Sequence, residues 1–312
     1  MIPRRRAKPT KWRLLLIWLA DTNPTVWAIN TVSNTANKLY NTYLLKGLSK
    51  RRRLIMRFGV CAPLEKVDVL AEVGYDYIEL IVQDELMPEA DDTEFQQIRD
   101  RVAEATIKPE AYAYFIPGYL RVVGDTVDLP RLSDYVETAC QRAKAIGGEI
   151  IVYGSCHSRN LQPSDSYQTA LDQIAEFLDM AAGHAEEHGI TIVIEPICHL
   201  EGNIIRTVAE GLEMAKRVNR KGIRLLADLY HVWQENEPMS NILEAAEWLA
   251  HVHIAEPVKR SYPGNDNFDF DDFFTALKKA GYYGRISCEC SFDDFDLNVV
   301  TALQTMKTYV DI

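Results

Sequence analysis

From Met56 onward the sequence alternates between short β-rich runs and longer amphipathic stretches, and this alternation repeats eight times. Such alternation is typical of a parallel sheet whose strands are joined by helical crossovers. The clearest helical stretch is Tyr167–His188, where apolar residues recur at helical spacing before Gly189. We predict the strands at residues 57–62, 75–82, 109–115, 149–155, 191–196, 224–230, 251–256 and 285–290.

Eight such units within residues 56–312 fit a (β/α)8 TIM barrel, an α/β fold of about 250 residues. A doubly wound open sheet is the structural alternative. It would ordinarily show fewer strands and a glycine-rich dinucleotide loop after the first strand, and no such loop is present in the sequence. We therefore predict a single (β/α)8 barrel catalytic domain over residues 56–312, with its active site at the carboxyl ends of the strands.

The charge of the chain is divided unevenly between its two parts. Residues 1–55 carry 12 Lys and Arg against the single acid Asp21, whereas the remainder carries 22 basic and 44 acidic residues. The net negative charge of residues 56–312 opposes binding to nucleic acid, because such binding depends on the neutralisation of phosphates by Lys and Arg. It favours substrates that are neutral or bridged by a metal ion.

We expect residues 1–55 to be a basic N-terminal extension that is disordered or not part of the natural protein, with Met56 as the natural start. The alternative is a signal or transit segment. The sequence has no run of 18 apolar residues that could span a membrane, and one short cationic segment anchors poorly to lipid. The six cysteines show no CxxC spacing, which predicts reduced thiols and a cytoplasmic location.

Four ionisable residues stand at the ends of four successive predicted strands: Glu195, Asp228, His253 and Glu289. A single acid at a strand end is most often a helix cap or a loop charge. Three acids and a histidine gathered in an apolar barrel mouth would cost several kcal/mol each if no cation were present. Carboxylates with one imidazole suit a divalent ion of intermediate hardness, such as Mn²⁺, Co²⁺ or Mg²⁺.

Two histidines lie two residues apart on the seventh strand, so both side chains face the same side of it. We expect His253, which is nearer the carboxyl end, to reach the metal, and His251 to fill a layer inside the barrel. Glu79 on the second strand has two open interpretations: it lines the sugar pocket, or it makes structural hydrogen bonds.

Several local motifs can be compared with known proteins. They are GYDYIEL at residues 74–80, EP at 195–196 followed by Glu201 and Asn203, DLYH at 228–231, HVHI at 251–254, FDF at 268–270 and ISCE at 286–289. Together they resemble the sugar isomerase/epimerase superfamily of xylose isomerase-like TIM barrels. Within it, the chain is most similar to the ketose 3-epimerases of the tagatose/allulose type. The resemblance covers about residues 57–310.

The resemblance implies a metal ion, most simply Mn²⁺, held by Glu195, Asp228, His253 and Glu289. It also implies that the two glutamates act as acid and base in the C3 epimerisation of a ketose. One removes the C3 proton to give an enediolate, and the other returns a proton on the opposite face. A single base would tend to return the proton to the face from which it came.

The same resemblance implies that Glu201, His231 and an arginine after the seventh strand contact substrate oxygens. Lys259 and Arg260 are adjacent there, and we favour Arg260 for its fork of donors. The loop departs from the expected epimerase pattern, which is richer in Asn and Asp. The pocket after strands one to four would set the choice of sugar, with candidates at Tyr114, Phe115, Tyr119 and Tyr153.

Other functions are compatible with parts of the same sequence pattern. A hydroxypyruvate isomerase-like aldose–ketose isomerase or an inosose dehydratase-like lyase would use the same metal site. An endonuclease-IV-like repair enzyme would need further histidines on strands two and three, which the sequence lacks there. A non-catalytic sugar-binding barrel would not need all four ligands. We predict an unphosphorylated sugar as the partner, because no convincing phosphate-binding glycine loop follows strands seven and eight, and a homodimer or homotetramer by resemblance.

Overall fold

The computed structural model describes residues 56–310, so the expectation for residues 1–55 lies outside the described part of the chain. Eight parallel strands close into a barrel in sequence order, and β8 pairs with β1. All eight overlap the predicted strands, which confirms the (β/α)8 TIM barrel. The strands are β1 (Arg57–Cys61), β2 (Tyr77–Ile81), β3 (Pro109–Ala113), β4 (Ile150–Tyr153), β5 (Thr191–Ile194), β6 (Ile223–Asp228), β7 (Leu249–Ile254) and β8 (Arg285–Cys288).

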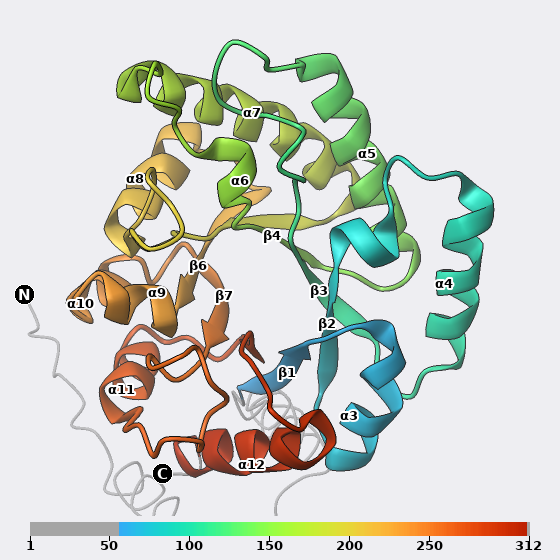
Figure 1. The fold of residues 1–312 in the computed structure, drawn as a ribbon, viewed down its shortest axis with the longest axis vertical. Coiled ribbons are helices and arrows are strands. Elements are labelled where there is room, and N and C mark those ends of the chain that lie inside the picture. Colours follow the sequence, from blue (N-terminus) through green and yellow to red (C-terminus); the bar gives the residue numbers. More distant parts are fainter. Residues whose placement is uncertain (1–55, 311–312) are drawn as a thin grey trace, which may run out of the picture. The chain divides into compact units, whose positions relative to one another are not determined.

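Helices follow the strands in turn and surround the barrel (Figure 1). The predicted helix over Tyr167–His188 is confirmed as α7, with the Ser166 hydroxyl capping its start and Gly189 ending it at a positive φ of 66°. No helix within residues 56–310 is long and apolar enough to cross a membrane. The helices are η1 (Leu64–Lys66), α3 (Val67–Val73), η2 (Val82–Leu86), α4 (Asp92–Glu104), α5 (Leu129–Ala145), α6 (Cys156–Arg159), α7 (Tyr167–His188), α8 (Val208–Val218), α9 (Leu229–Gln234), α10 (Ser240–Glu244), α11 (Asp271–Lys279) and α12 (Phe295–Thr308).

The apolar core has two parts. The larger part lies between the strands and the surrounding helices, and the smaller one fills the barrel interior. The interior includes the fully buried ring of Tyr77, whose carbon atoms would lie only 2.4 Å from a Cβ atom placed at Gly59. Gly59 on β1 is therefore the residue that makes room for this ring. Side chains thus fill the barrel interior beneath the carboxyl ends of the strands, as expected for this fold.

All eight strands end one or two residues before the predicted end, and three of these ends position metal ligands. The sixth strand was expected to reach residue 230, but β6 ends at Asp228, because its carboxylate accepts a hydrogen bond from the Tyr230 N–H and starts α9 there. The fifth and eighth strands are also shorter than predicted, so Glu195 and Glu289 are the first residues beyond β5 and β8. All of these side chains therefore emerge at one rim of the barrel.

Candidate metal and active site

The four predicted ligands meet at the carboxyl ends of β5 to β8. Each of them offers a ligand atom, and these atoms all lie within 4.8 Å of one another. Asp228 and His253 are paired in register between β6 and β7, which places their side chains next to each other. The His253 Nδ1 atom lies 3.2 Å from an oxygen of Glu195 and 3.2 Å from an oxygen of Glu289. The structure therefore brings together all four residues that the sequence singled out.

Carboxylates outnumber the positive groups in this cluster, and its side chains are shielded from water. Glu195, Asp228 and His253 are 4%, 1% and 0% exposed. One positive charge reaches the carboxylates from the loop after β7: the Arg260 guanidinium lies 3.0 Å from Asp228 and also bonds to Glu289. Three largely shielded carboxylates gathered around one imidazole form a centre that strongly favours a cation.

The pKa values of these groups follow from the same charges. Burial raises the pKa of Glu195, and the negative charge of Glu289 raises it further. Burial would also raise the pKa of Glu289, but the positive charges of Arg260 and His253 outweigh it and lower this pKa to about 2. Burial works against a charged His253, yet Glu79 and Glu289 hold its pKa well above the usual range. These shifts favour a charged His253 beside an ionised Glu289, with the Arg260 guanidinium as the second positive group.

The donor set fits a divalent metal ion. Carboxylate oxygens and an imidazole nitrogen are the ligands chosen by Mn²⁺, Co²⁺ and Mg²⁺, and a thiolate-rich zinc site is not formed by these four residues. The His253 Nδ1 atom faces two carboxylates at equal distance, an arrangement that is favourable only when a proton or a metal ion supplies positive charge. We therefore assign a candidate divalent metal site to these four side chains.

A cavity of about 340 Å³ opens beside the metal ligands and is large enough for a small molecule. All three residues predicted to contact substrate lie on its wall, together with Glu195 and Glu289. The lining residues are Gln83, Tyr114, Ile116, Gly118, Gly154, Ser155, Cys156, His157, Glu195, Ile197, Glu201, His231, Arg260 and Glu289.

His231 presents a hydrogen-bond donor to this cavity. Its Nδ1 atom accepts a hydrogen bond from the Cys198 N–H at 3.3 Å, so the ring proton of the neutral form is on Nε2. The Nε2 atom is buried, lies 3.6 Å from an Asp228 oxygen, and has no hydrogen-bond partner among the described residues. A buried donor that faces a cavity is well suited to bind an oxygen atom of a ligand.

The structure places Arg260, rather than the neighbouring Lys259, at the cavity. Lys259 is exposed, whereas the Arg260 guanidinium packs over the Tyr230 ring at 4.8 Å and lies 3.3 Å from Glu201. Both residues have positive φ angles, 61° and 52°, which L-amino acids rarely adopt. This strained turn directs the guanidinium back toward the metal ligands.

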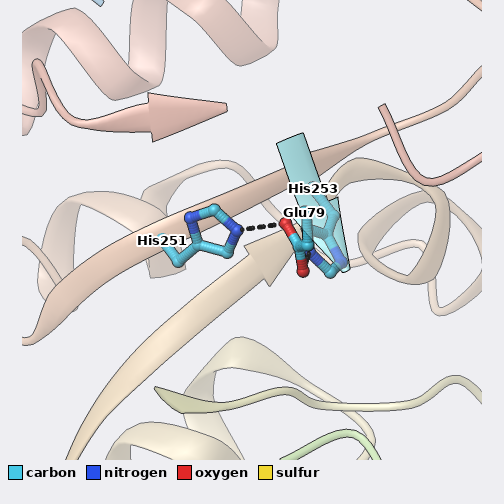
Figure 2. Close-up of side chains that lie close together, drawn as sticks. All are labelled: Glu79, His251 and His253. Atoms are coloured by element: carbon cyan, nitrogen blue, oxygen red, sulfur yellow. Dashed lines mark hydrogen bonds and ion pairs between the residues drawn. The ribbon is translucent and has the colours of Figure 1, made fainter. Parts of the chain in front are cut away.

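Glu79 and His251 lie inside the barrel, away from the cavity wall. Both are 0% exposed, and neither lines the cavity. One Glu79 oxygen is 2.8 Å from the His251 Nε2 atom, and the other is 3.0 Å from the His253 Nε2 atom (Figure 2). Of the two interpretations of Glu79, the structure therefore favours hydrogen bonding over a place in the sugar pocket.

The aromatic residues proposed for the sugar pocket are only partly correct. Tyr114 lines the cavity, but Phe115 and Tyr153 are fully buried, and the Tyr153 ring packs against Phe177 of α7 at 5.1 Å. Tyr119 is 67% exposed and bonds to Glu89 instead. Tyr153 lies at the end of β4, where neighbouring residues point alternately toward the pocket and toward the helices, whereas Phe115 and Tyr119 lie beyond β3, where the strand pattern gives no direction.

Sequence reasoning missed a buried arginine behind the site. Arg159 of α6 is 0% exposed, and its guanidinium donates to the backbone carbonyls of Tyr153 at 2.8 Å and Glu195 at 2.6 Å. It thereby ties the end of β4 to the end of β5, just where Glu195 leaves the strand. No motif marks this role, because it depends on backbone carbonyls that come together only in the folded barrel.

Sequence reasoning also missed Gly154, which follows β4. A Cβ atom at this position would lie 2.0 Å from the Glu195 carboxylate, so only glycine lets that carboxylate occupy its place. We expect Gly154→Ala to displace the carboxylate and to lower catalytic turnover about 100-fold, the usual cost of a displacement of about 1 Å.

The matched control is Gly183→Ala in α7, where a new Cβ atom would meet no atom within 4 Å. This control should keep full turnover and gain a little stability, because alanine favours helix more than glycine. Steady-state kinetics and thermal melts of both variants check the prediction. Equal turnover in the two variants would show that Glu195 does not need this close approach.

A family model described as xylose isomerase-like TIM barrel matches residues 67–309. The chain belongs to this family. Its membership agrees with the closed barrel and with the resemblance noted in the sequence.

An L-ribulose 3-epimerase of Methylomonas sp. (strain DH-1) is 29% identical over 232 residues, which is 74% of this chain and 77% of that protein. A ketose 3-epimerase of Arthrobacter globiformis is 31% identical over 151 residues, 48% of this chain and 50% of that protein. A crystal structure of a D-psicose 3-epimerase in the presence of D-fructose superposes with a TM-score of 0.73 at 18% identity, covering 82% of this chain and 99% of that one. The chain is thus an enzyme of the isomerase and epimerase type.

Proposed function

We propose that this family member is a metal-dependent sugar epimerase that inverts C3 of an unphosphorylated ketose. The observation that carries the proposal is the placement of two glutamates, Glu195 and Glu289, in one cavity and in one ligand cluster. They come from β5 and β8, which have two strands between them, so they can approach a bound molecule from different directions. Inversion at carbon by proton transfer is favoured by such a pair of acid and base groups, one on each face.

The side chains that line the cavity have separate roles in the proposed reaction. One glutamate removes the C3 proton from one face of the sugar, and the other delivers a proton to the opposite face. The starting epimer decides which of the two acts first. The Nε2–H of His231 and the guanidinium of Arg260 donate hydrogen bonds to the sugar oxygens near the reacting carbon, and Glu201 accepts one.

Glu195, Asp228, His253 and Glu289 would hold the divalent ion, which we propose to be Mn²⁺, with Co²⁺ and Mg²⁺ as chemically suitable alternatives. When bound, such an ion supplies Lewis-acid polarisation of the ketose oxygens, which makes the C3 proton more acidic. The pKa of Glu195 is raised and that of Glu289 is lowered, and such a separation supports an acid and a base role for the two groups.

The cavity wall supports an uncharged sugar over a phosphorylated one. Among its described lining residues, Arg260 is the sole Lys or Arg, and its guanidinium is already bonded to Asp228 and Glu289. Three glutamates share the wall with it. A phosphate group would meet net negative charge there, whereas sugar hydroxyl groups would find both donors and acceptors.

The direct test is product identification. We expect the Mn²⁺-loaded chain to convert at least one of fructose, tagatose, allulose and sorbose into its C3 epimer, as resolved by chromatography, and the metal-free chain to convert none. Formation of an aldose would support an aldose–ketose isomerase instead. If the chain binds Mn²⁺ tightly and changes none of the four sugars, the ketose proposal is wrong, and inososes become the next substrates to test.

A further inference from the structure

A chain of buried polar contacts runs behind the metal ligands. Glu79 comes from β2, and both of its carboxylate oxygens are used: one by His251 and one by His253 of β7. All three side chains are 0% exposed, and Figure 2 shows them grouped inside the barrel. Neither Glu79 nor His251 reaches the cavity, so neither can touch a substrate there.

We propose that Glu79 is a positioning residue that fixes the His253 ring so that its Nδ1 atom faces the metal site. The proposal rests on the metal site assigned above. An ionised carboxylate can only accept hydrogen bonds, so a histidine nitrogen that bonds to it must carry hydrogen. The contact at 3.0 Å therefore places a hydrogen on Nε2 of His253, so Nδ1 is the nitrogen that faces the ligand cluster and can bind a metal ion in place of a proton.

The direction of the ring is set by contacts on both of its sides. Its Nε2 atom is held by Glu79, and its Nδ1 atom lies 3.2 Å from Glu195 and from Glu289. A ring rotated by 180° would place carbon atoms opposite these oxygens and lose every hydrogen bond. A carboxylate behind a ligating histidine also makes the ring a better electron donor to the metal.

His251 in turn fixes Glu79. It lies two residues before His253, so both rings face the same side of β7 and meet the same carboxylate. The contact of His251 Nε2 with the second Glu79 oxygen, at 2.8 Å, prevents the carboxylate from rotating away from His253. This arrangement explains why a barrel interior that is otherwise mostly apolar contains a glutamate and a second histidine.

Glu79→Gln tests the proposal, with Tyr77→Phe as the matched control. Tyr77 lies two residues earlier on β2, is equally buried, and bonds to Ser287 rather than to Glu79; Ser287 makes only a long contact, of 3.5 Å, with His251. We expect Glu79→Gln to weaken Mn²⁺ binding 10- to 100-fold in titration calorimetry, the usual effect of losing such a partner. Tyr77→Phe should change the affinity less than about threefold. At saturating Mn²⁺ the KM of Glu79→Gln for sugar should remain unchanged.

Wild-type affinity in Glu79→Gln, or an equal loss in both variants, would overturn the role of Glu79. A wild-type chain that binds no Mn²⁺ would overturn the proposed metal site itself, so the two failures are distinguishable. If Glu79→Gln does not fold, nitrogen NMR of the wild-type chain loaded with Zn²⁺ decides. Hydrogen on Nε2 of His253 supports the proposal, and hydrogen on Nδ1 contradicts it.

Discussion

Replacing either Glu195 or Glu289 with glutamine is expected to lower kcat at least about 1,000-fold, which corresponds to about 4 kcal/mol of activation free energy. Glutamine keeps the size and hydrogen-bonding shape of each side chain but can neither take up nor release the proton. Both residues line the cavity, and each contacts His253 through one oxygen. Because inversion uses one group on each face of the sugar, the loss of either should stop turnover.

The measurement is steady-state conversion of the best ketose at saturating Mn²⁺, with metal affinity recorded separately because both residues are also proposed ligands. The matched control is Glu237→Gln, which replaces another buried glutamate that caps α8 and does not line the cavity. The control should keep wild-type kcat. If one of the two cavity variants retained most of its activity with metal bound, a one-base mechanism would replace the proposed one.

A substitution at the metal site is also expected to have a large effect. We expect Asp228→Asn to weaken Mn²⁺ binding at least 100-fold and to remove most of the heat stability that the ion confers on the wild-type chain. An ion present at about 1,000 times its Kd stabilises the folded state by about 4 kcal/mol. Asparagine can still accept the hydrogen bond from the Tyr230 N–H, so the start of α9 should remain capped.

Thermal melts with and without Mn²⁺ measure this effect. Asp91→Asn is the matched control, because Asp91 also caps a helix, α4, but lies outside the ligand cluster. The control should melt higher on addition of Mn²⁺ by the same amount as the wild-type chain, whereas Asp228→Asn should show little change. An equal rise in Tm for Asp228→Asn would mean that the ion binds elsewhere.

Much of the fold follows from the sequence, because the hydrophobic periodicity marks each β/α unit. The four ligands could be predicted for a topological reason: a closed barrel brings all strand ends to one rim, so polar residues at successive ends must meet. Strand ends were less predictable. Asp228 ends β6 through a side-chain hydrogen bond to Tyr230, and the strand pattern before it carries no sign of that contact.

The supporting contacts of the site could not be predicted, because they depend on three-dimensional register. Glu79 meets His251 and His253 across the barrel interior, and Arg159 binds two backbone carbonyls. Gly154 is needed only because the Glu195 carboxylate approaches it closely. Each of these contacts depends on the direction of a side chain and on the distance to a segment remote in sequence. The local sequence pattern contains no information on either.

In the proposed reaction two glutamates exchange the proton at C3 in the presence of a divalent ion. The most direct test is incubation of the Mn²⁺-loaded chain with a ketose in D₂O, followed by NMR of each carbon position. We predict a C3 epimer that carries deuterium at C3, whose formation depends on the metal and is lost in both Glu195→Gln and Glu289→Gln. Deuterium at C1 with formation of an aldose, or C3 exchange that persists in both variants, would contradict the account.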